Sequence, residues 1–367
     1  MIFLGKINVG ILFGGKSTEH EVSLQSAKNV IAALDKEKYT VSLIGIDKTG
    51  HWYLQNSSQF LLNGNDLQHT VLNKTNHDVI LVPWQEQKAL RSLSDASVSS
   101  QIDVVFPILH GAYGEDGTVQ GLLKLANIPF VGAGVLGSAI GMDKDVAKRL
   151  LRDAGIPIAD FIVCRRGEQD KLNFREITAK LGLPLFIKPA NAGSSVGVSK
   201  VTNEIEFNQA IAEAFAFDNK VLIEEYIVGR EVECAVLGNE RAMASRVGEI
   251  IANKEFYSYE AKYIDESGAA LEIPAKLDSK DEERIKQMAL KTFNVLCCEG
   301  MARVDFFMTI DKKLVVNEIN TIPGFTTISM YPKLWEISGV SYKELIDRLI
   351  QLALTRHAAE QRLKTSI

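Results

Sequence analysis

The sequence predicts an α/β protein, with a Rossmann-like domain on a parallel sheet at the N-terminus and a second unit of α+β character after it. A chain of 367 residues is long enough for two or three domains. Apolar strand-like runs alternate with helical segments as far as residue 131, which is typical of a parallel sheet. A helix at residues 143–154 then leads into the second unit, which contains an alternating hairpin at residues 300–325.

The N-terminal domain starts with a buried strand over residues 7–13 and a turn into a helix. Thr18 and Glu21 have the spacing of a capping box, which predicts that this helix begins there. The turn brings Glu19 and His20 to the carboxyl end of the strand, where open α/β sheets bind ligands. Glu19 is therefore a candidate ligand contact, and stabilisation of the helix dipole is the alternative.

The same turn matches the P-loop pattern G-x-x-x-x-G-K-[ST] over residues 10–17. In a P-loop the glycine-rich loop lies outside the strand, so that it can wrap a phosphate. Residues 11–13 are instead typical of the strand's own apolar run. We therefore expect a turn that contacts a small ligand, and no P-loop.

Two further strands are predicted in this domain, at residues 41–47 and 103–109. The polar stretch between them, residues 52–100, indicates hairpins and loop without catalytic groups. His110 follows the third strand directly and precedes glycines. It is either a ligand contact or a structural histidine whose hydrogen bonds are satisfied.

Two lysines of the second unit are placed to bind anions. Lys144 lies in the first turn of the helix at residues 143–154, where the dipole disfavours a cation. It is therefore a candidate contact for an anionic ligand, and a solvated lysine is the alternative. Lys188 lies in an otherwise apolar strand, and a turn of glycines and serines at residues 193–197 follows it. The backbone N–H groups of such a hairpin can close over phosphates.

The rest of the second unit contains one acidic strand, one long loop and two helices. Residues 221–227 form an apolar strand that turns acidic at Glu224, as in a linker that bonds an adenine amine and ribose hydroxyls. Residues 253–268 form a polar loop, and a loop of this length inside a compact domain is commonly a functional lid. Helices are predicted at residues 281–298 and 342–358.

The hairpin at residues 300–325 gathers polar side chains on one face. A polar turn is predicted at residues 310–312. If Asp311 and Lys312 are its two turn residues, Asp305 lies opposite Glu318, and the period of two along each strand puts both carboxylates on one side. Facing carboxylates repel unless a cation lies between them, and Asp, Glu and Asn oxygens suit Mg²⁺ that bridges substrate phosphates. A solvated hairpin face is the alternative. The predicted face consists of Arg303, Asp305, Glu318 and Asn320.

The composition argues against several classes of protein. The net charge is -5 and no basic stripe is present, so neither nucleic acid nor an anionic membrane is an expected partner. The four cysteines include an adjacent pair but no C-x-x-C spacing, which argues against a zinc site or a disulfide framework. The apolar N-terminus is too short for a membrane span and lacks the features of a signal peptide, so we expect a cytoplasmic protein.

Eight segments in this order resemble the ATP-grasp ligases and, among them, the D-alanine:D-alanine ligase family in its longer bacterial form. The resemblance spans nearly the whole chain and implies a two-lobed ATP-grasp fold after the N-terminal domain, with domains at residues 1–134, 135–222 and 223–367. The segments are GGKSTEHEVSL (14–24), HGAYGEDG (110–117), MDKDVAKRLL (142–151), FIKPANAGSSVGV (186–198), EEYIVGREVE (224–233), YEAKYID (259–265), GMARVDFF (300–307) and NEINTIPGFT (317–326).

The resemblance implies the ATP-dependent ligation of two D-alanine molecules for peptidoglycan synthesis. One carboxylate attacks the γ-phosphate of ATP to give D-alanyl phosphate, which the amine of the second D-alanine then attacks. ADP and phosphate are released. The resemblance also implies two Mg²⁺ or Mn²⁺ ions, activation by potassium and a homodimer.

The resemblance also implies roles for particular residues. Asp305 and Glu318 are implied to bind one metal ion, and Glu318 and Asn320 the second. Arg303 and the Gly324 N–H are implied to stabilise the oxyanion. The residues implied to hold ATP are Lys144, Lys188, Ser195, Glu224, Tyr226, Ile227 and Glu231.

The D-alanine contacts are implied in the same way. Glu19 would anchor the first ammonium near His110, while Ser329 and Met330 would meet the second carboxylate. The lid loop would contribute Lys262 to the substrate site. The triad that latches the lid is implied to be Glu19, Ser194 and Tyr263.

Two other functions share most of these motifs. A D-alanine:D-lactate ligase replaces the lid tyrosine, so Tyr263 argues against that activity. A non-catalytic ATP-grasp regulator would be expected to have lost at least one of the polar residues of the hairpin, and Arg303, Asp305, Glu318 and Asn320 are all present.

Overall fold

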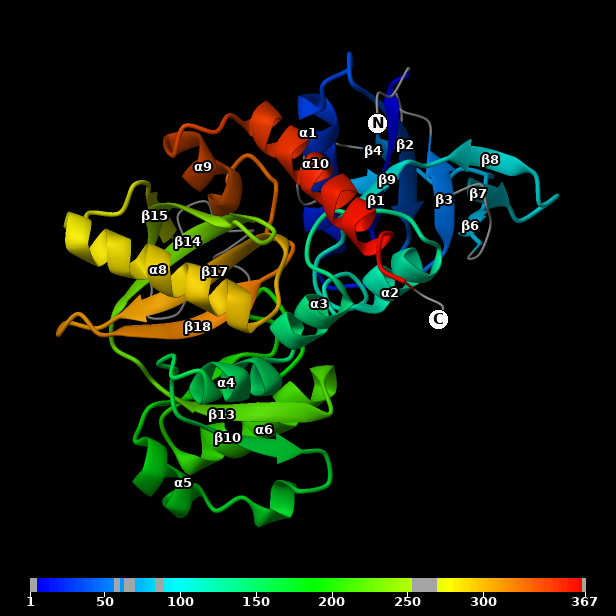
Figure 1. Ribbon diagram of the computed structural model, residues 1–367. Coiled ribbons are helices and arrows are strands. Elements are labelled where there is room, and N and C mark those ends of the chain that lie inside the picture. The colour runs from blue at the N-terminus through cyan, green and yellow to red at the C-terminus, as the bar shows by residue number, and fades with distance from the viewer. Residues whose placement is uncertain (1–4, 56–59, 63–69, 83–88, 253–268, 365–367) are drawn as a thin grey trace.

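The structure is a computed structural model, and it describes residues 5–55, 60–62, 70–82, 89–252 and 269–364. The helices and strands form three groups, each built around its own sheet (Figure 1). The fold is mixed α/β, as predicted. No helix in the described part of the chain is long and apolar enough to cross a bilayer.

The N-terminal group is a four-stranded sheet in the order β3-β2-β1-β9, with parallel pairing of β1 to both β2 and β9 and antiparallel pairing of β3 at the edge. Gly10 to Gly14 lie within β1, so the P-loop pattern is indeed part of a strand. At Gly14 φ is +90°, and a Cβ atom would lie 2.2 Å from the Ile46 carbonyl oxygen, so the turn requires glycine. The elements are β1 (Ile7–Gly14), α1 (His20–Ala33), β2 (Tyr39–Ile46), β3 (Trp52–Gln55), β9 (Val104–Ile108), α2 (Thr118–Leu125) and α3 (Val135–Met142).

The capping-box prediction for α1 is wrong. The helix begins at His20, and the residue in the N-cap position is Glu19, which makes no side-chain capping bond. The carboxylate of Glu21 instead forms an ion pair with Lys48, 2.6 Å away. Between β3 and β9, the short strands pair as hairpins, as predicted. They are β4 (Leu61–Leu62), β5 (Val71–Leu72), β6 (Val79–Leu81), β7 (Ala89–Ser92) and β8 (Val98–Gln101).

The central group is an antiparallel sheet in the order β10-β13-β11-β12, drawn in green at the bottom of Figure 1. Helix α4 starts one residue after its N-cap Asp143, whose side chain accepts a hydrogen bond from Val146 N. Asn203 caps α6 in the same way. The elements are α4 (Lys144–Asp153), β10 (Phe161–Arg165), η1 (Gln169–Lys171), α5 (Phe174–Leu181), β11 (Leu185–Pro189), β12 (Ser199–Val201), α6 (Glu204–Phe217) and β13 (Lys220–Glu225).

The C-terminal group is a five-stranded antiparallel sheet in the order β16-β15-β14-β17-β18. Helix α8 ends at Val295, so Cys297 and Cys298 lie beyond the helix that was predicted to include them. All four cysteines are free thiols. The elements are β14 (Arg230–Gly238), β15 (Met243–Ala252), β16 (Ala269–Glu272), α8 (Ser279–Val295), β17 (Gly300–Met308), β18 (Leu314–Asn320), α9 (Met330–Ile337) and α10 (Tyr342–Glu360).

The first and last parts of the chain share one hydrophobic core. Buried side chains of β1 and α1 pack with those of β17, α9 and α10, and Figure 1 shows α10 beside α1. Arg356 of α10 donates hydrogen bonds to the carbonyl oxygens of Phe130 and Gly132, at 2.8 and 2.6 Å, and lies over the Phe130 ring. The central group instead has a core of its own, built from residues between Cys164 and Ile223. The division at residues 134 and 222 stays a prediction.

Candidate active site

A cavity of about 390 Å³ lies between the central and C-terminal sheets. Phe186 and Tyr226 form an aromatic wall, with ring centroids 5.7 Å apart. Glu318 of β18 lines the opposite side. All the residues predicted to hold a nucleotide line this cavity: Lys144, Lys188, Ser195, Glu224, Tyr226, Ile227 and Glu231.

The turn between β11 and β12 has a conformation suited to an anion. Ser194 and Ser195 are both in the left-handed region, with φ of 50° and 61°, and Gly197 has φ of 67°. Successive residues in turn conformations direct backbone N–H groups into a common concavity, which attracts negative charge. Gly193, Ser194 and Ser195 line the cavity, so this concavity faces it.

Two lysines and one carboxylate form a buried group, of which Lys188 and Glu224 line the cavity. Glu224 forms an ion pair with Lys188 at 2.9 Å through Oε1 and one with Lys148 at 3.1 Å through Oε2. Burial favours the neutral carboxyl, but the two ammonium groups outweigh it and hold the pKa of Glu224 below its usual value. Burial also lowers the pKa of Lys148. No sequence pattern singled out Lys148, although it lies one helical turn after Lys144 on the same face.

The predicted pairing of the metal hairpin is confirmed, but the predicted turn is wrong. Asp305 pairs with Glu318, and Arg303 with Asn320. The loop has three residues, 310–312, rather than two. Thr309 N donates to the Lys313 carbonyl oxygen at 3.0 Å, and Lys312 N donates to the Thr309 carbonyl oxygen at 2.9 Å. That loop alone shifts the register by one residue. A β-bulge after Asp305 shifts it back, so the two carboxylates still face each other.

Positive side chains offset the facing carboxylates. Arg303 donates two hydrogen bonds of 2.7 Å to Asp305 and forms a 2.9 Å ion pair with Glu233. Burial disfavours the Arg303 charge, but Asp305 and Glu233 outweigh it and hold the pKa of Arg303 well above its usual value. Lys144 forms a 3.2 Å ion pair with Glu318. This face is therefore an ordered set of charges rather than a solvated surface.

The oxygen atoms of this face fit a hard divalent cation. The Asn320 amide nitrogen donates to Asp305 Oδ2 at 2.9 Å, which identifies the opposite oxygen of the amide as the available ligand atom. Within the described ranges no group of three or more His, Cys, Asp or Glu side chains is placed to hold a metal ion. Two carboxylates and an amide oxygen are a donor set that Mg²⁺ accepts when phosphate oxygens and water complete its shell.

A hydrogen bond joins the N-terminal domain to the phosphate hairpin. The Ser194 hydroxyl donates to the carboxylate of Glu19, which is buried at the start of α1. These two members of the predicted triad are therefore in contact. Lys262 and the third member, Tyr263, lie in residues 253–268, outside the described residues.

His110 and Glu115 lie next to Glu19 and join the N-terminal group to the loop after β18. His110 is buried, with Nδ1 3.0 Å from the Ile322 carbonyl oxygen and Nε2 3.3 Å from Ser26 Oγ, and burial lowers its pKa. Glu115 accepts hydrogen bonds from Gly111 N and Ile322 N, at 2.8 and 2.9 Å. Desolvation, followed by the charge of Glu19, raises the pKa of Glu115 to about 8. Glu115 was not among the predicted site residues, although it belongs to the HGAYGEDG segment.

The loop after β18 brings Gly324, Ser329 and Met330 together. A Cβ atom on Gly324 would lie 2.7 Å from Ser329 Oγ, so the backbone passes close to this hydroxyl. Ser329 Oγ also accepts a hydrogen bond from Thr326 N at 2.9 Å. Met330 is the first residue of α9, and its side chain is buried against Gly248. Its backbone N–H, at a helix N-terminus, is the group suited to a carboxylate.

Two family models match most of the chain. The model described as the D-ala D-ala ligase N-terminus matches residues 8–133, and the model described as the D-ala D-ala ligase C-terminus matches residues 150–351. The C-terminal match contains the cavity lysine Lys188, the hairpin and the metal face.

Relatives of known sequence cover nearly the whole chain. A D-alanine:D-alanine ligase of Oceanobacillus iheyensis is 57% identical over 98% of this chain and 99% of its own. D-alanine:D-alanine ligase A of Escherichia coli (strain K12) is 53% identical over 99% of this chain and 100% of its own.

Solved structures agree with this assignment. The D-alanine-D-alanine ligase of Coxiella burnetii has a TM-score of 0.84 at 40% identity and covers 97% of this chain and 96% of its own. The VanG D-Ala:D-Ser ligase of Enterococcus faecalis has a TM-score of 0.84 at 38% identity, over 95% of this chain and 100% of its own. With both family models and the full-length relatives in agreement, the chain belongs to the D-alanine:D-alanine ligases, a family of ATP-dependent enzymes.

Proposed function

We propose that the protein joins two D-alanine molecules into D-alanyl-D-alanine with ATP, for peptidoglycan precursor synthesis in the cytoplasm. The observation that supports this most strongly is the single cavity that combines two lysines, a phosphate hairpin and a carboxylate of the metal face. Phosphoryl transfer depends mainly on positioning and neutralisation of charge, and this cavity supplies both. A homodimer and potassium activation are part of the proposal and depend on the family resemblance alone.

The nucleotide would lie along the cavity with its base at the aromatic wall. Tyr226 and Ile227 would contact adenine, and Glu231 the ribose. Lys144 and Lys188 would bind the phosphates together with the backbone around Ser195. Glu224 also lines the cavity, but its carboxylate is bonded to Lys148 and Lys188, so its main contribution would be to hold Lys188 in place.

Asp305, Glu318 and Asn320 would hold the divalent cations, Mg²⁺ or Mn²⁺, together with oxygens of the nucleotide. Bound there, the cations would neutralise charge on the phosphates as the γ-phosphoryl group is transferred. Glu318 already contacts Lys144, so the metal face and the phosphate lysines adjoin.

The two D-alanine molecules would lie between Glu19 and the loop after β18. Glu19 would anchor the first ammonium, and the Ser329 hydroxyl and Met330 N–H would meet the second carboxylate. Attack of the second amine on D-alanyl phosphate would place negative charge on a carbonyl oxygen near Arg303 and the Gly324 N–H. Donors fixed before the reaction are well suited to this charge, and ion pairs with Asp305 and Glu233 fix Arg303.

The decisive assay is phosphate release with ATP and Mg²⁺, scanned over D-alanine, D-serine, D-lactate and L-alanine, with the products identified by mass spectrometry. We expect D-alanyl-D-alanine as the main product. D-alanyl-D-lactate as the main product would favour the alternative ligase, and phosphate release without any ligated product would contradict the proposal. The relatives at 53% and 57% identity, both D-alanine:D-alanine ligases by name, favour D-alanine.

A further inference from the structure

We propose that Lys220 is a positioning residue of the phosphate site, which holds Lys144 and the phosphate hairpin in one arrangement without touching the nucleotide. The inference rests on the proposed function, because it assigns Lys220 a role in ATP binding. Lys220 begins β13 and does not contribute to the cavity lining.

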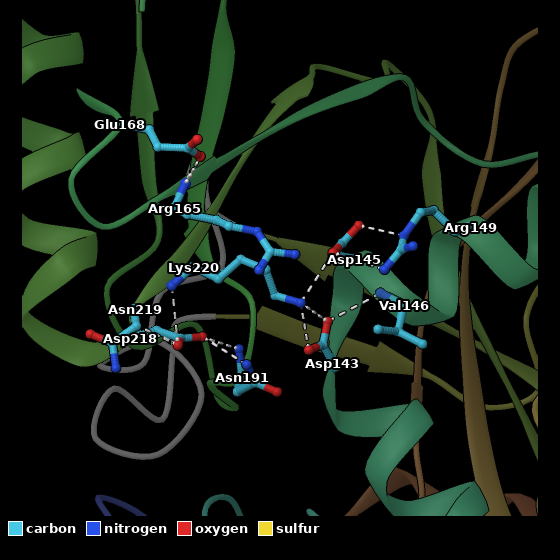
Figure 2. Close-up of polar contacts among 10 residues, drawn as sticks. All are labelled: Asp143, Asp145, Val146, Arg149, Arg165, Glu168, Asn191, Asp218, Asn219 and Lys220. Atoms are coloured by element: carbon cyan, nitrogen blue, oxygen red, sulfur yellow. Dashed lines mark hydrogen bonds and ion pairs between the residues drawn. The ribbon is translucent and has the colours of Figure 1, made fainter. Parts of the chain in front are cut away.

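The ammonium group of Lys220 bridges two carboxylates at the start of α4. Its Nζ lies 2.7 and 2.6 Å from the two oxygens of Asp143 and 3.1 Å from Asp145 Oδ2 (Figure 2). The Lys220 side chain is 16% exposed and that of Asp145 only 5%, so bulk water screens these contacts weakly. Arg149 Nε lies 2.9 Å from the other oxygen of Asp145, Oδ1, but the Arg149 side chain is 53% exposed.

Asp143 connects this ion pair to Lys144. Its side chain caps α4 through Val146 N at 3.1 Å, so its position fixes the first turn of the helix. Lys144, the next residue, donates from its backbone N–H to the Ala190 carbonyl oxygen at 3.0 Å. Its Nζ donates to the Ala192 carbonyl oxygen at 2.8 Å. The orientation of the Lys144 ammonium therefore depends on the first turn of α4.

The backbone around Lys220 holds the base of the phosphate hairpin. Ala190 N donates to the Lys220 carbonyl oxygen at 2.9 Å. Asn191 donates to Asp218 Oδ2 from both its backbone and its side-chain nitrogen, at 2.7 and 2.9 Å (Figure 2). The backbone N–H of Lys220 in turn donates to Asp218 Oδ1 at 3.3 Å. The Lys220 carbonyl oxygen and the Asp218 carboxylate thus hold the base of the hairpin, while the Lys220 side chain holds the start of α4.

This arrangement makes Lys144 and the hairpin a single unit, and both parts line the cavity that would hold the phosphates of ATP. Without the Lys220 ammonium, Asp143 and Asp145 would repel each other at the start of α4. The first turn would then shift relative to the hairpin. A displacement of about 1 Å in a group that positions a substrate can lower the rate about 100-fold, even when the altered residue is remote from the chemistry.

The test compares Lys220→Met with Lys220→Arg and with the control Arg149→Met. We expect Lys220→Met to lower kcat/KM for ATP about 10- to 100-fold while KM for D-alanine changes less than about twofold. Lys220→Arg should restore most of the loss because it keeps the charge. Arg149→Met removes a cation from the same Asp145 but leaves Asp143 paired, and it should behave as wild type.

Two further measurements keep the test decisive. If Lys220→Met does not fold, Asp143→Asn takes its place, because asparagine still caps a helix but carries no charge for Lys220. The affinity for a non-hydrolysable ATP analogue, measured by calorimetry, should fall in both variants whatever the wild-type ligation product is. Failure of wild type to make a dipeptide would thus contradict only the proposed function. Unchanged analogue affinity, or an equal loss for ATP and D-alanine, would show that Lys220 is structural and overturn the inference.

Discussion

Replacing Glu224 with glutamine should destabilise the ligand-free protein far more than replacing Lys148 with methionine. Both changes remove one charge from the same buried group, in which Lys148, Glu224 and Lys188 are 1%, 3% and 8% exposed. They differ in what remains. Lys148→Met leaves one carboxylate paired with one lysine, whereas Glu224→Gln leaves two buried ammonium groups without a counter-charge.

The distances set the size of the difference. At an effective dielectric constant of about 20, unit charges separated by 3.1 or 2.9 Å attract by about 5 to 6 kcal/mol. In Glu224→Gln, a lysine escapes this loss by releasing its proton, which at pH 7 costs about 4 to 5 kcal/mol for an ordinary lysine pKa of about 10.4. That value is the cost of neutralising one of the two lysines, and it sets the scale of the loss in unfolding free energy. Lys148→Met also relieves the desolvation of one ammonium, so it should cost only about 0 to 2 kcal/mol.

The assay is urea unfolding of wild type and both variants at pH 7 and pH 9. In Glu224→Gln the folded state binds fewer protons than the unfolded state, in which the lysine remains charged up to its ordinary pKa. The stability of this variant relative to wild type should therefore rise by about 1.4 kcal/mol per pH unit. Equal losses for the two variants at pH 7, or a deficit of Glu224→Gln that does not shrink by pH 9, would refute the reasoning.

Other parts of the site give independent predictions. Glu318→Ala should abolish ligation, since both proposed cations lose a ligand, and near-normal phosphate release by this variant would exclude a bridging carboxylate. Asp305→Asn should keep an ATP affinity that is measurable by calorimetry. In the folded protein Glu115 keeps its proton up to about pH 8, so the stability of wild type should fall as the pH rises from the ordinary carboxyl pKa to about 8. Glu115→Gln should flatten that part of the stability profile, measured by thermal unfolding. Ser194→Ala removes the hydroxyl that donates to Glu19 and should lower kcat/KM for D-alanine about 10-fold, whereas the control Ser199→Ala should be unaffected. Equal kcat/KM values for the two variants would show that the Ser194 hydroxyl has no role.

Local patterns predicted the strands and the functional face because both depend on short-range periodicity. The pairing of Asp305 with Glu318 follows from alternation along two adjacent strands. The three-residue loop and the compensating bulge escaped prediction, because turn polarity alone does not distinguish a two-residue loop from a longer loop with a bulge. The prediction was right only because the bulge cancelled the error in the turn.

Contacts between distant segments were beyond the sequence patterns. In the sequence nothing distinguishes Lys148 from other helical lysines, and only the structure shows that Glu224 lies beside it. The hydrogen bond from Ile322 N to Glu115 depends on the meeting of the N-terminal group with the loop after β18, which no periodicity indicates. The capping-box prediction failed for a related reason. Glu19 occupies the N-cap position, and its carboxylate bonds to Ser194 of another domain rather than to the helix.

The core shared by α1, α9 and α10 bears on the order in which a newly made chain folds. Residues of β1 and α1 leave the ribosome first, but the face they form is covered only when α10 has been synthesised, nearly at the end of the chain. The sheet of the central group, with α5 and α6, has its own core between Cys164 and Ile223, and no later segment contributes to that core. During synthesis the middle of the protein therefore becomes stable before its beginning, and the exposed face of the first domain is the surface that a chaperone has the longest time to bind.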